Sequence, residues 1–200
     1  MTSLGNMIRP NTATIHGVVS TLVSGPTEVI TTAEAKTHTR VDHSNDDTYL
    51  DTLVVAARQY VERVTRRSIG AQTWDFFWDS FASHIEIPKP PLVSVTTVKY
   101  TDEDGTQQTA TGTLYTTDAD AVPGLVHLAH DQSWPSFRAI PNTIEIRAVV
   151  GSATVPKPIE QAMLLLIGHW YENREAIVVG TIASQIPMAV DALLAPYTVY

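Results

Sequence analysis

The period of the hydrophobic pattern changes twice along the chain, which predicts two helical parts separated by a β-rich middle. Over residues 45–67 apolar side chains recur at spacings of three and four, as on one face of an amphipathic helix. These side chains are Tyr49, Leu50, Leu53, Val54, Ala57, Tyr60, Val61 and Val64. Residues 158–171 form a more apolar helical run, which we expect to be buried. A last short helix is expected over residues 187–194.

Local start and stop signals refine these helices. Thr31 is followed three residues later by a glutamate, a capping-box pattern that predicts a short helix over residues 32–39. We expect Asp42 or Ser44 to cap the long helix, because their side chains can accept bonds from free backbone amides. We expect Gly70 to end that helix, since glycine favours the left-handed conformation common at helix C-termini.

The middle of the chain reads as strands. Strand-like stretches, several of them alternating apolar and polar residues, occur at residues 74–78, 84–87, 93–100, 114–115, 125–128 and 143–150. Asp104 and Gly105 form a dipeptide typical of a hairpin turn between two of them. The predicted fold class is therefore α+β, with a helical core and a β-rich insertion over residues 71–150.

The expected organisation is one domain with extensions. Residues 1–30, rich in Thr, Ser, Gly and Pro, are predicted to form an extended arm with a short strand near residues 18–23. Residues 31–200 form a single domain that contains the insertion. A short apolar strand or loop is expected at residues 177–179. The stretch 189–200 is apolar and aromatic, which is unfavourable in water, so we expect it to dock on a partner.

Charge is unevenly distributed over the chain. The net charge is −8, and residues 71–154 alone hold ten acidic and four basic side chains. Four arginines cluster on and just after the long helix, namely Arg58, Arg63, Arg66 and Arg67. They indicate either a solvated helix face, on which Glu62 can pair with Arg58 or Arg66, or a subunit contact. A protein that grips DNA needs more clustered cations than this, so direct DNA binding is disfavoured.

No motif for catalysis or metal binding is present. The chain has no cysteine, which excludes thiolate chemistry and disulfides. His127 and His130 lie on a predicted strand and loop, where their spacing does not bring two imidazoles together. Asp102 to Gly105 lacks the alternating ligands of a calcium loop. We therefore expect no enzyme activity, no cofactor and no metal. The longest apolar run, residues 162–168, is too short to cross a bilayer, so no membrane partner is expected.

Aromatic residues beside a charged corner indicate contact. Trp170 and Tyr171 are adjacent, so they cannot both face one side of a helix. At least one of them is expected to meet a neighbouring element or subunit, and large aromatic residues dominate such interfaces. Arg174 follows in the charged corner. We take these three residues and the four arginines above as candidates for subunit contact.

Several stretches, in the same order, resemble one family. They are Thr32-Ala33-Glu34-Ala35-Lys36 with Arg40-Val41-Asp42, Ala56 to Glu62 with Thr65-Arg66-Arg67, Gln72-Thr73-Trp74, Pro88 to Val95, Gln132 to Pro135, and Pro158-Ile159 through Gly168 to Glu175. With them, residues 28–200 resemble the phage head–tail connector (adaptor) proteins of the HK97 gp6-like and phiE125 gp8-like group, also found in gene transfer agents.

The resemblance implies a structural role in the virion. Such proteins form a ring, typically dodecameric, that joins the portal to a stopper or tail protein and leaves a channel for DNA. The neck of the virion would be the location, after assembly in the host bacterial cytoplasm. The family's C-terminal segment reaches the portal, which here implies the apolar residues of the tail, Val190, Leu193, Leu194, Tyr197, Val199 and Tyr200. Deleting residues 189–200 is then expected to abolish portal docking and leave the fold intact.

Two alternatives remain open on the sequence. A tail-completion or stopper protein also forms rings, although the long helix over residues 45–67 disfavours it. A small soluble enzyme would have to use the acidic middle region, and no convergent pocket residues are recognisable there. In the adaptor reading, the arginine cluster and the acidic middle region supply complementary charges between neighbouring subunits. The acidic balance would also let DNA pass without specific binding.

Overall fold

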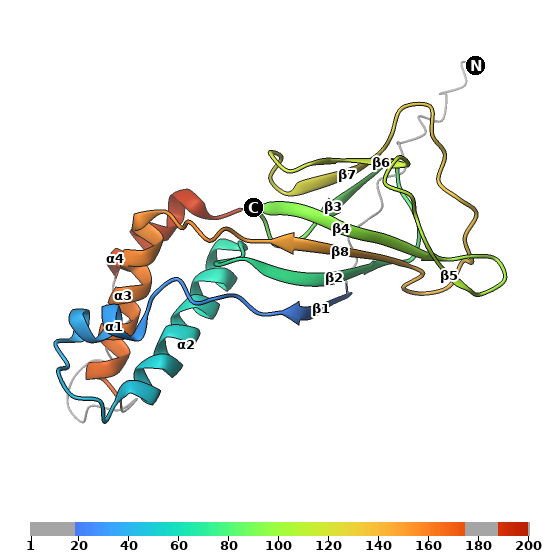
Figure 1. The fold of residues 1–200 in the computed structure, drawn as a ribbon. Helices are drawn as coiled ribbons and strands as arrows, with labels where there is room; N and C mark the ends of the chain where they lie inside the picture. The colour runs from blue at the N-terminus through green and yellow to red at the C-terminus, as the bar shows by residue number, and fades with distance from the viewer. Residues whose placement is uncertain (1–18, 175–187, 200) are drawn as a thin grey trace, which may run out of the picture. The chain divides into compact units, whose positions relative to one another are not determined.

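The computed structural model describes residues 19–174 and 188–199, and within them it has four α-helices and two antiparallel β-sheets (Figure 1). The predicted α+β class is confirmed. Contacts divide the chain into two units. The β unit takes in residues 19–23, 73–88 and 92–149, and the helical unit takes in the remaining described residues.

The helical unit contains α1 (Thr32–Thr39), α2 (Asp47–Thr65), α3 (Lys157–Glu172) and α4 (Met188–Leu194), followed by the 3₁₀ turn η1 (Ala195–Tyr197). The α3 helix contacts each of the other three helices (Figure 1). All four helices lie within two residues of the predicted ranges. Their apolar faces form one core of buried side chains, whose fully enclosed members include Leu50, Ala57, Val61, Ala162, Met163, Leu166, Ile167, Val190 and Leu194.

The start of α1 is as predicted. The Thr31 hydroxyl accepts a hydrogen bond from the backbone amide of Glu34 at 3.2 Å, and the Glu34 carboxylate accepts one from the Thr31 amide at 2.8 Å. This reciprocal pair satisfies two amides that a helix start leaves without partners.

The residues predicted to cap the two ends of α2 are wrong, although the range of the helix is close to the prediction. Asp46, not Asp42 or Ser44, precedes the helix, and its side chain makes no capping bond because it is engaged by Tyr171 and Arg174. At the other end the helix stops at Thr65, and Arg66 adopts the left-handed conformation expected for glycine, with φ 56°. The left-handed conformation is unfavourable for a non-glycine residue, so an arginine at this position does not signal a helix end.

Gly70 serves a close approach between two segments instead. Gly70 has φ +78°, and Gly151 has φ +81°, which only glycine adopts readily. A Cβ atom on Gly151 would lie 2.1 Å from the carbonyl oxygen of Gly70. The neighbouring residues Ile69 and Ser152 form a parallel β-bridge. The chain that leaves the first helical part and the chain that enters the second therefore touch backbone to backbone.

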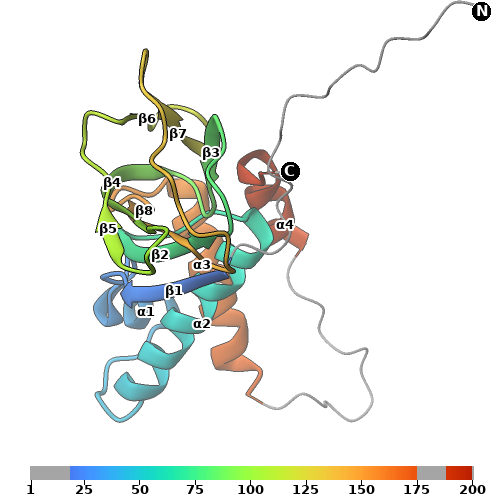
Figure 2. The ribbon, with the colours of Figure 1, turned by 90° about the vertical axis from the view of Figure 1, so that its right-hand side faces the viewer.

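The β unit has a five-stranded sheet and a three-stranded sheet (Figure 2). The order in the larger sheet is β1 (Val19–Ser24), β2 (Gln72–Trp78), β8 (Ile144–Val150), β4 (Leu92–Thr101) and β5 (Gln107–Thr109). The smaller sheet has the order β3 (His84–Ile87), β7 (Gly124–Leu128) and β6 (Tyr115–Asp118). Five of the six strand-like stretches of the middle region fall on strands, and the sixth, at residues 114–115, overlaps β6 only at Tyr115. Strand β5 was not expected, and β1 falls where a short strand was expected.

The hairpin at Asp104 and Gly105 is also confirmed. Strands β4 and β5 pair antiparallel, with Lys99 opposite Thr109. Asp102 organises the turn: its carboxylate accepts from the Thr106 amide at 2.8 Å and from the Gln108 side chain at 2.9 Å. Burial alternates strictly along β8, as in a strand with one buried face.

Some expectations concern residues that the structure does not describe. They are most of the N-terminal arm, the apolar stretch at residues 177–179, and Tyr200.

Candidate docking and subunit-contact surfaces

A pocket of about 460 Å³ lies in the helical unit where α2 ends. It is lined by Gln59, Glu62, Arg63, Arg66, Arg67, Ser68, Gln72 and Lys89. We call it the basic pocket, because four of these side chains are cationic and one is acidic. Three of the four arginines proposed from the sequence therefore meet in one depression, and Lys89, distant in sequence, joins them.

The acidic member of the pocket is occupied by internal bonds. One Glu62 carboxylate oxygen accepts from the guanidinium of Arg58 at 2.9 Å. The other accepts from the backbone amide of Ile69 at 2.9 Å and from the Gln72 side chain. Of the two pairings that the sequence allowed for Glu62, the structure has the one with Arg58.

Arg58 differs from the other arginines of the cluster. Its side chain is 9% exposed, and its Nε also donates to the two carboxylate oxygens of Glu28, at 2.9 and 3.0 Å. This arginine contributes to the stability of the fold, because removing one partner of a buried ion pair leaves the other charge uncompensated. Arg58 therefore binds within its own helical unit, and the structure places it away from the surface offered to a neighbour.

Arg63 and Arg66 are exposed, by contrast. Neither takes part in an ion pair within the described residues, and Arg63 lies 5.9 Å from the ring centroid of Tyr60. The Nε of Arg67 donates to the carbonyl oxygen of Tyr197 at 2.7 Å. Arg63 and Arg66 are thus the two arginines whose charges are available to a partner.

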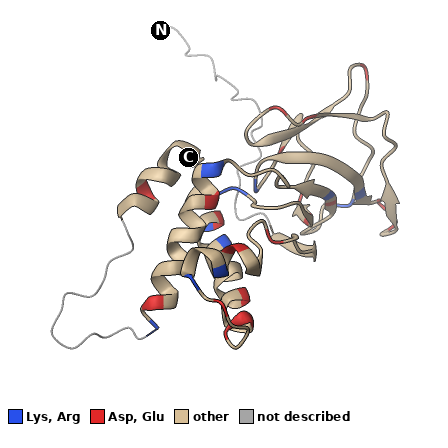
Figure 3. Ribbon diagram, turned by 60° about the vertical axis from the view of Figure 1, so that its left-hand side comes forward, with Lys and Arg blue, Asp and Glu red and all other residues tan. Residues whose placement is uncertain are grey.

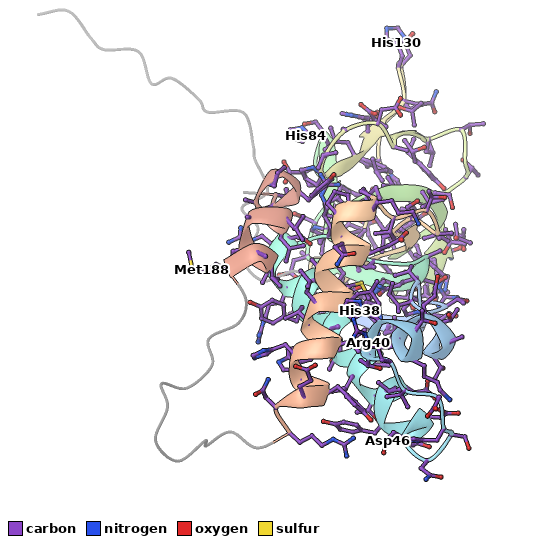
Figure 4. All side chains as sticks on the ribbon, turned by 90° about the vertical axis from the view of Figure 1, so that its left-hand side faces the viewer. His38, Arg40, Asp46, His84, His130 and Met188 are labelled. Carbon is purple, nitrogen blue, oxygen red and sulfur yellow. The ribbon has the colours of Figure 1, made fainter. Side chains whose placement is uncertain are left out.

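The aromatic corner at the end of α3 contacts the start of α2. Tyr171 donates its hydroxyl to Asp46, and Arg174 bonds the same carboxylate at 2.9 Å. The Arg174 guanidinium also lies 4.6 Å from the Tyr49 ring centroid and 4.7 Å from that of Tyr171. Figure 4 shows Asp46 at the end of α2 beside the end of α3. These contacts join two chain segments by charge-assisted hydrogen bonds and cation–π packing.

Trp170 also packs inside the helical unit. Its ring meets Tyr60 edge-on, with centroids 6.2 Å apart. Both adjacent aromatic residues therefore contact α2: Trp170 packs against Tyr60, and Tyr171 packs against Tyr49. This satisfies the expectation that at least one meets a neighbouring element, and a subunit contact through them stays a prediction.

The Asp46 cluster predicts a pH effect on stability. The hydrogen bond from Tyr171, followed by that from Arg174, lowers the pKa of Asp46 below its ordinary value, and the same bond raises the pKa of Tyr171. A lowered folded-state pKa contributes stability above the unfolded pKa of about 3.9, and that stability is lost as pH falls through the folded pKa.

We therefore expect Asp46→Asn to be less stable than the wild type at pH 7, with the difference narrowing as the pH is lowered to 3. Tyr171→Phe, which keeps the ring and removes the donor, is expected to show the same pattern. Urea denaturation at the two pH values measures this. An equal loss of stability at both would mean that the carboxylate charge contributes nothing.

The C-terminal segment is divided between core and surface. Val190 and Leu194 are fully buried in the core of the helical unit, and Leu193 and Tyr197 pack against it. Val199 donates its amide to the Thr65 carbonyl oxygen at 3.0 Å, while its side chain stays partly exposed. Met188, 85% exposed, points away from the ribbon in Figure 4. Two of the predicted portal-contact residues thus already have partners within the chain.

Acidic side chains of the β unit gather on its turns (Figure 3). Asp102, Glu103 and Asp104 lie between β4 and β5, Asp118 ends β6, and Asp120 lies on the turn that follows. Others are neutralised on the sheet: the carboxylate of Asp75 receives Nε and Nη2 of Arg147 at 2.7 and 2.8 Å. The unpaired negative charge of this unit is therefore concentrated on turns.

The histidines and carboxylates of the described residues form no group that could hold a metal ion. His84 and His127 are opposite each other on β3 and β7, with ring centroids 6.3 Å apart. His130 extends into solvent (Figure 4). No described helix is long and apolar enough to cross a membrane.

Comparison with known proteins identifies a family. Residues 29–125 match the model of the family described as "Phage gp6-like head-tail connector protein". No curated protein sequence matches the chain significantly. The matched range runs from the start of α1 into the three-stranded sheet, so it spans parts of both units.

Solved structures with the same fold come from gene transfer agent (GTA) particles. A chain of the "Virion of native gene transfer agent (GTA) particle" has a TM-score of 0.72 and 20% identity, covering 90% of this chain and 95% of that one. A chain of the "Neck of empty GTA particle computed with C6 symmetry" has a TM-score of 0.70 and 17% identity, covering 91% and 96%. A chain of the "Neck of native GTA particle computed with C12 symmetry" has 0.67 and 18%, covering 91% and 96%.

The resemblance seen in the sequence is thereby confirmed, and its assignment to structural proteins rather than enzymes follows from the family. Residues 29–125 thus resemble the phage gp6-like head-tail connector family in sequence, and about nine-tenths of the chain shares its fold with chains of gene transfer agent particles.

Proposed function

We propose that this chain is a head–tail adaptor of a virion neck, where copies of it form a ring between the portal and a stopper or tail protein. The observation that carries the proposal is the fold shared with neck chains over 91% of this chain and 96% of theirs. The symmetries named for those necks, C6 and C12, favour a ring of twelve copies here. Rings require two different surfaces on each copy.

The charge of the chain suits passage of DNA through such a ring. The net charge is −8, and the two exposed arginines of the cluster at the end of α2, Arg63 and Arg66, lie together in one pocket. A protein that neutralised many DNA phosphates would need cations spread along a groove. We therefore propose that DNA passes through the channel without being bound specifically.

The portal contact is proposed for the partly exposed end of the C-terminal segment. Val190 and Leu194 hold α4 in the core, while Leu193, Tyr197 and Val199 stay partly exposed. Tyr200 follows them. In this arrangement the buried residues fix the position of the segment, and the exposed ones offer apolar and aromatic contacts of the kind that dominate interfaces.

Mixing the chain with the portal protein of the same particle tests the proposal. Light scattering should show a portal-bound ring, and Val199→Asp should weaken binding by about tenfold or more, because a charge would enter an apolar contact. Val93→Asp, at a 52% exposed valine of the β unit, is the matched control and should bind normally.

The outcomes separate two claims. A wild-type chain that stays monomeric and indifferent to portal would overturn the adaptor function. Normal binding by Val199→Asp would leave that function standing and remove the C-terminal segment from the portal contact. Urea denaturation of both variants checks that each is folded.

A further inference from the structure

We propose that the basic pocket of one copy binds the acidic β4–β5 turn of a second copy, with Glu103 and Asp104 entering between Arg63 and Arg66. The inference rests on the proposed ring and names the contact between its neighbouring subunits. It assigns a ligand class, paired carboxylates, to a pocket that the fold leaves open.

The pocket is lined by four basic side chains and one acidic side chain. Its one acidic side chain, Glu62, shares Arg58 with Glu28 and has both oxygens in hydrogen bonds. Arg63 and Arg66 are exposed and form no ion pair among the described residues. Since guanidinium groups present planar forks of donors, carboxylates are the ligands that fit them.

The size of the pocket favours a chain segment over a single ion. Its volume of about 460 Å³ is many times the roughly 30 Å³ that one water molecule occupies in the liquid. The tip of a turn with two acidic side chains fills such a space. Arg66 directly follows the last residue of α2 and has a left-handed backbone conformation. Its backbone position is therefore fixed by the end of the helix.

The β4–β5 turn is the densest acidic feature among the described residues. Asp102 is used internally, since its oxygens accept from Thr106 and Gln108. Glu103 and Asp104 are exposed and form no ion pair within the same part of the chain. One cation is near: a Cβ on Gly105 would lie 2.9 Å from Nη1 of Arg138. Three acids against one arginine still leave the turn negative.

The other acidic turn is a weaker ligand. Asp118 accepts from the backbone amides of Asp120 and Ala121 at 3.0 and 3.1 Å, so its carboxylate already stabilises its own turn. The turn at Asp104 therefore offers more unengaged charge. Because pocket and turn are different surfaces of one chain, their contact is heterologous and extends from copy to copy until a ring closes.

Disulfide trapping tests the contact directly, because the chain contains no cysteine. Gln59 lines the pocket and Thr106 follows the acidic turn, and both are exposed and uncharged. A Gln59→Cys chain mixed with a Thr106→Cys chain and oxidised should give a mixed dimer. We expect roughly tenfold more of it than with Thr117→Cys, an exposed control near the second acidic turn, because the charges bring only the first pair together.

Charge reversal at the pocket is a second test of the contact. Arg63→Glu with Arg66→Glu in the Gln59→Cys chain should abolish the mixed dimer, and added salt should reduce it for the unaltered pocket. The matched control is Arg40→Glu, because Arg40 is also an exposed arginine in left-handed conformation after a helix, with φ 58°. It should leave the yield unchanged.

Two failures are distinguishable. If the cysteine-free wild type forms no oligomer, alone or with portal, the proposed function fails and this contact fails with it. If the wild type assembles while the mixed dimer is absent, or is insensitive to reversal of Arg63 and Arg66, only the pocket–turn contact is wrong.

Discussion

Deletion of residues 188–200 is expected to lower the free energy of unfolding by about 3–6 kcal/mol, and so to damage the fold as well as any docking. Val190 and Leu194 are fully buried in the helical core, and full burial of each such side chain contributes about 1.5–3 kcal/mol. The Arg67–Tyr197 and Val199–Thr65 hydrogen bonds disappear as well. A loss of this size is a large part of the typical stability of a domain.

Urea denaturation of the truncated chain measures the effect, with Met188→Ala as the control at an 85% exposed position. A truncated chain as stable as the wild type would show that α4 contributes nothing to the core. The structure thus revises the expectation that the tail can be removed with the fold intact, because the sequence did not reveal that its apolar residues face inward. Portal binding is better tested with Val199→Asp.

Gly151→Ala is expected to destabilise the chain by about 2–5 kcal/mol. An alanine at φ +81° costs about 1–2 kcal/mol. Its Cβ would also lie 2.1 Å from the Gly70 carbonyl oxygen, so the two backbones must move apart at a further cost of about 1–3 kcal/mol. The bridge between Ile69 and Ser152 would open with them.

Gly25→Ala is the matched control in the same unit, because nothing lies within 4 Å of a Cβ there. It should change stability little. Equal urea midpoints for Gly151→Ala and the wild type would contradict the close approach. Because the clash is between a Cβ atom, which has no rotamer freedom, and a backbone oxygen, side-chain rearrangement cannot relieve it.

The sequence predicted the elements well and the contacts poorly, for physical reasons. Long amphipathic helices and alternating strands leave a periodic signal, and the capping box at Thr31 is local. The end of α2 depends on Arg66 adopting an unfavourable left-handed conformation. The residue types around it do not indicate this conformation. The start of α2 depends on Tyr171 and Arg174, more than 120 residues away.

The candidate site shows the same limit. Four arginines close in sequence suggested one charged face, but Arg58 turned out to be buried between Glu28 and Glu62. Lys89, which completes the basic pocket, comes from a loop between two strands. Its approach to Arg66 is a property of the tertiary fold, so helical spacing could not indicate it.

The backbone contact beside Gly151 bears on how this family diversifies. The insertion starts in β2 and ends in β8, which are neighbours in one sheet, so its two connections are about 4.8 Å apart. The entropy of closing a segment grows only slowly with its length. Hairpins can therefore be gained or lost between these two strands while the helices keep their packing. We expect connector genes of different lengths to differ mainly here, so that the β unit changes with the particle and the helical framework is inherited.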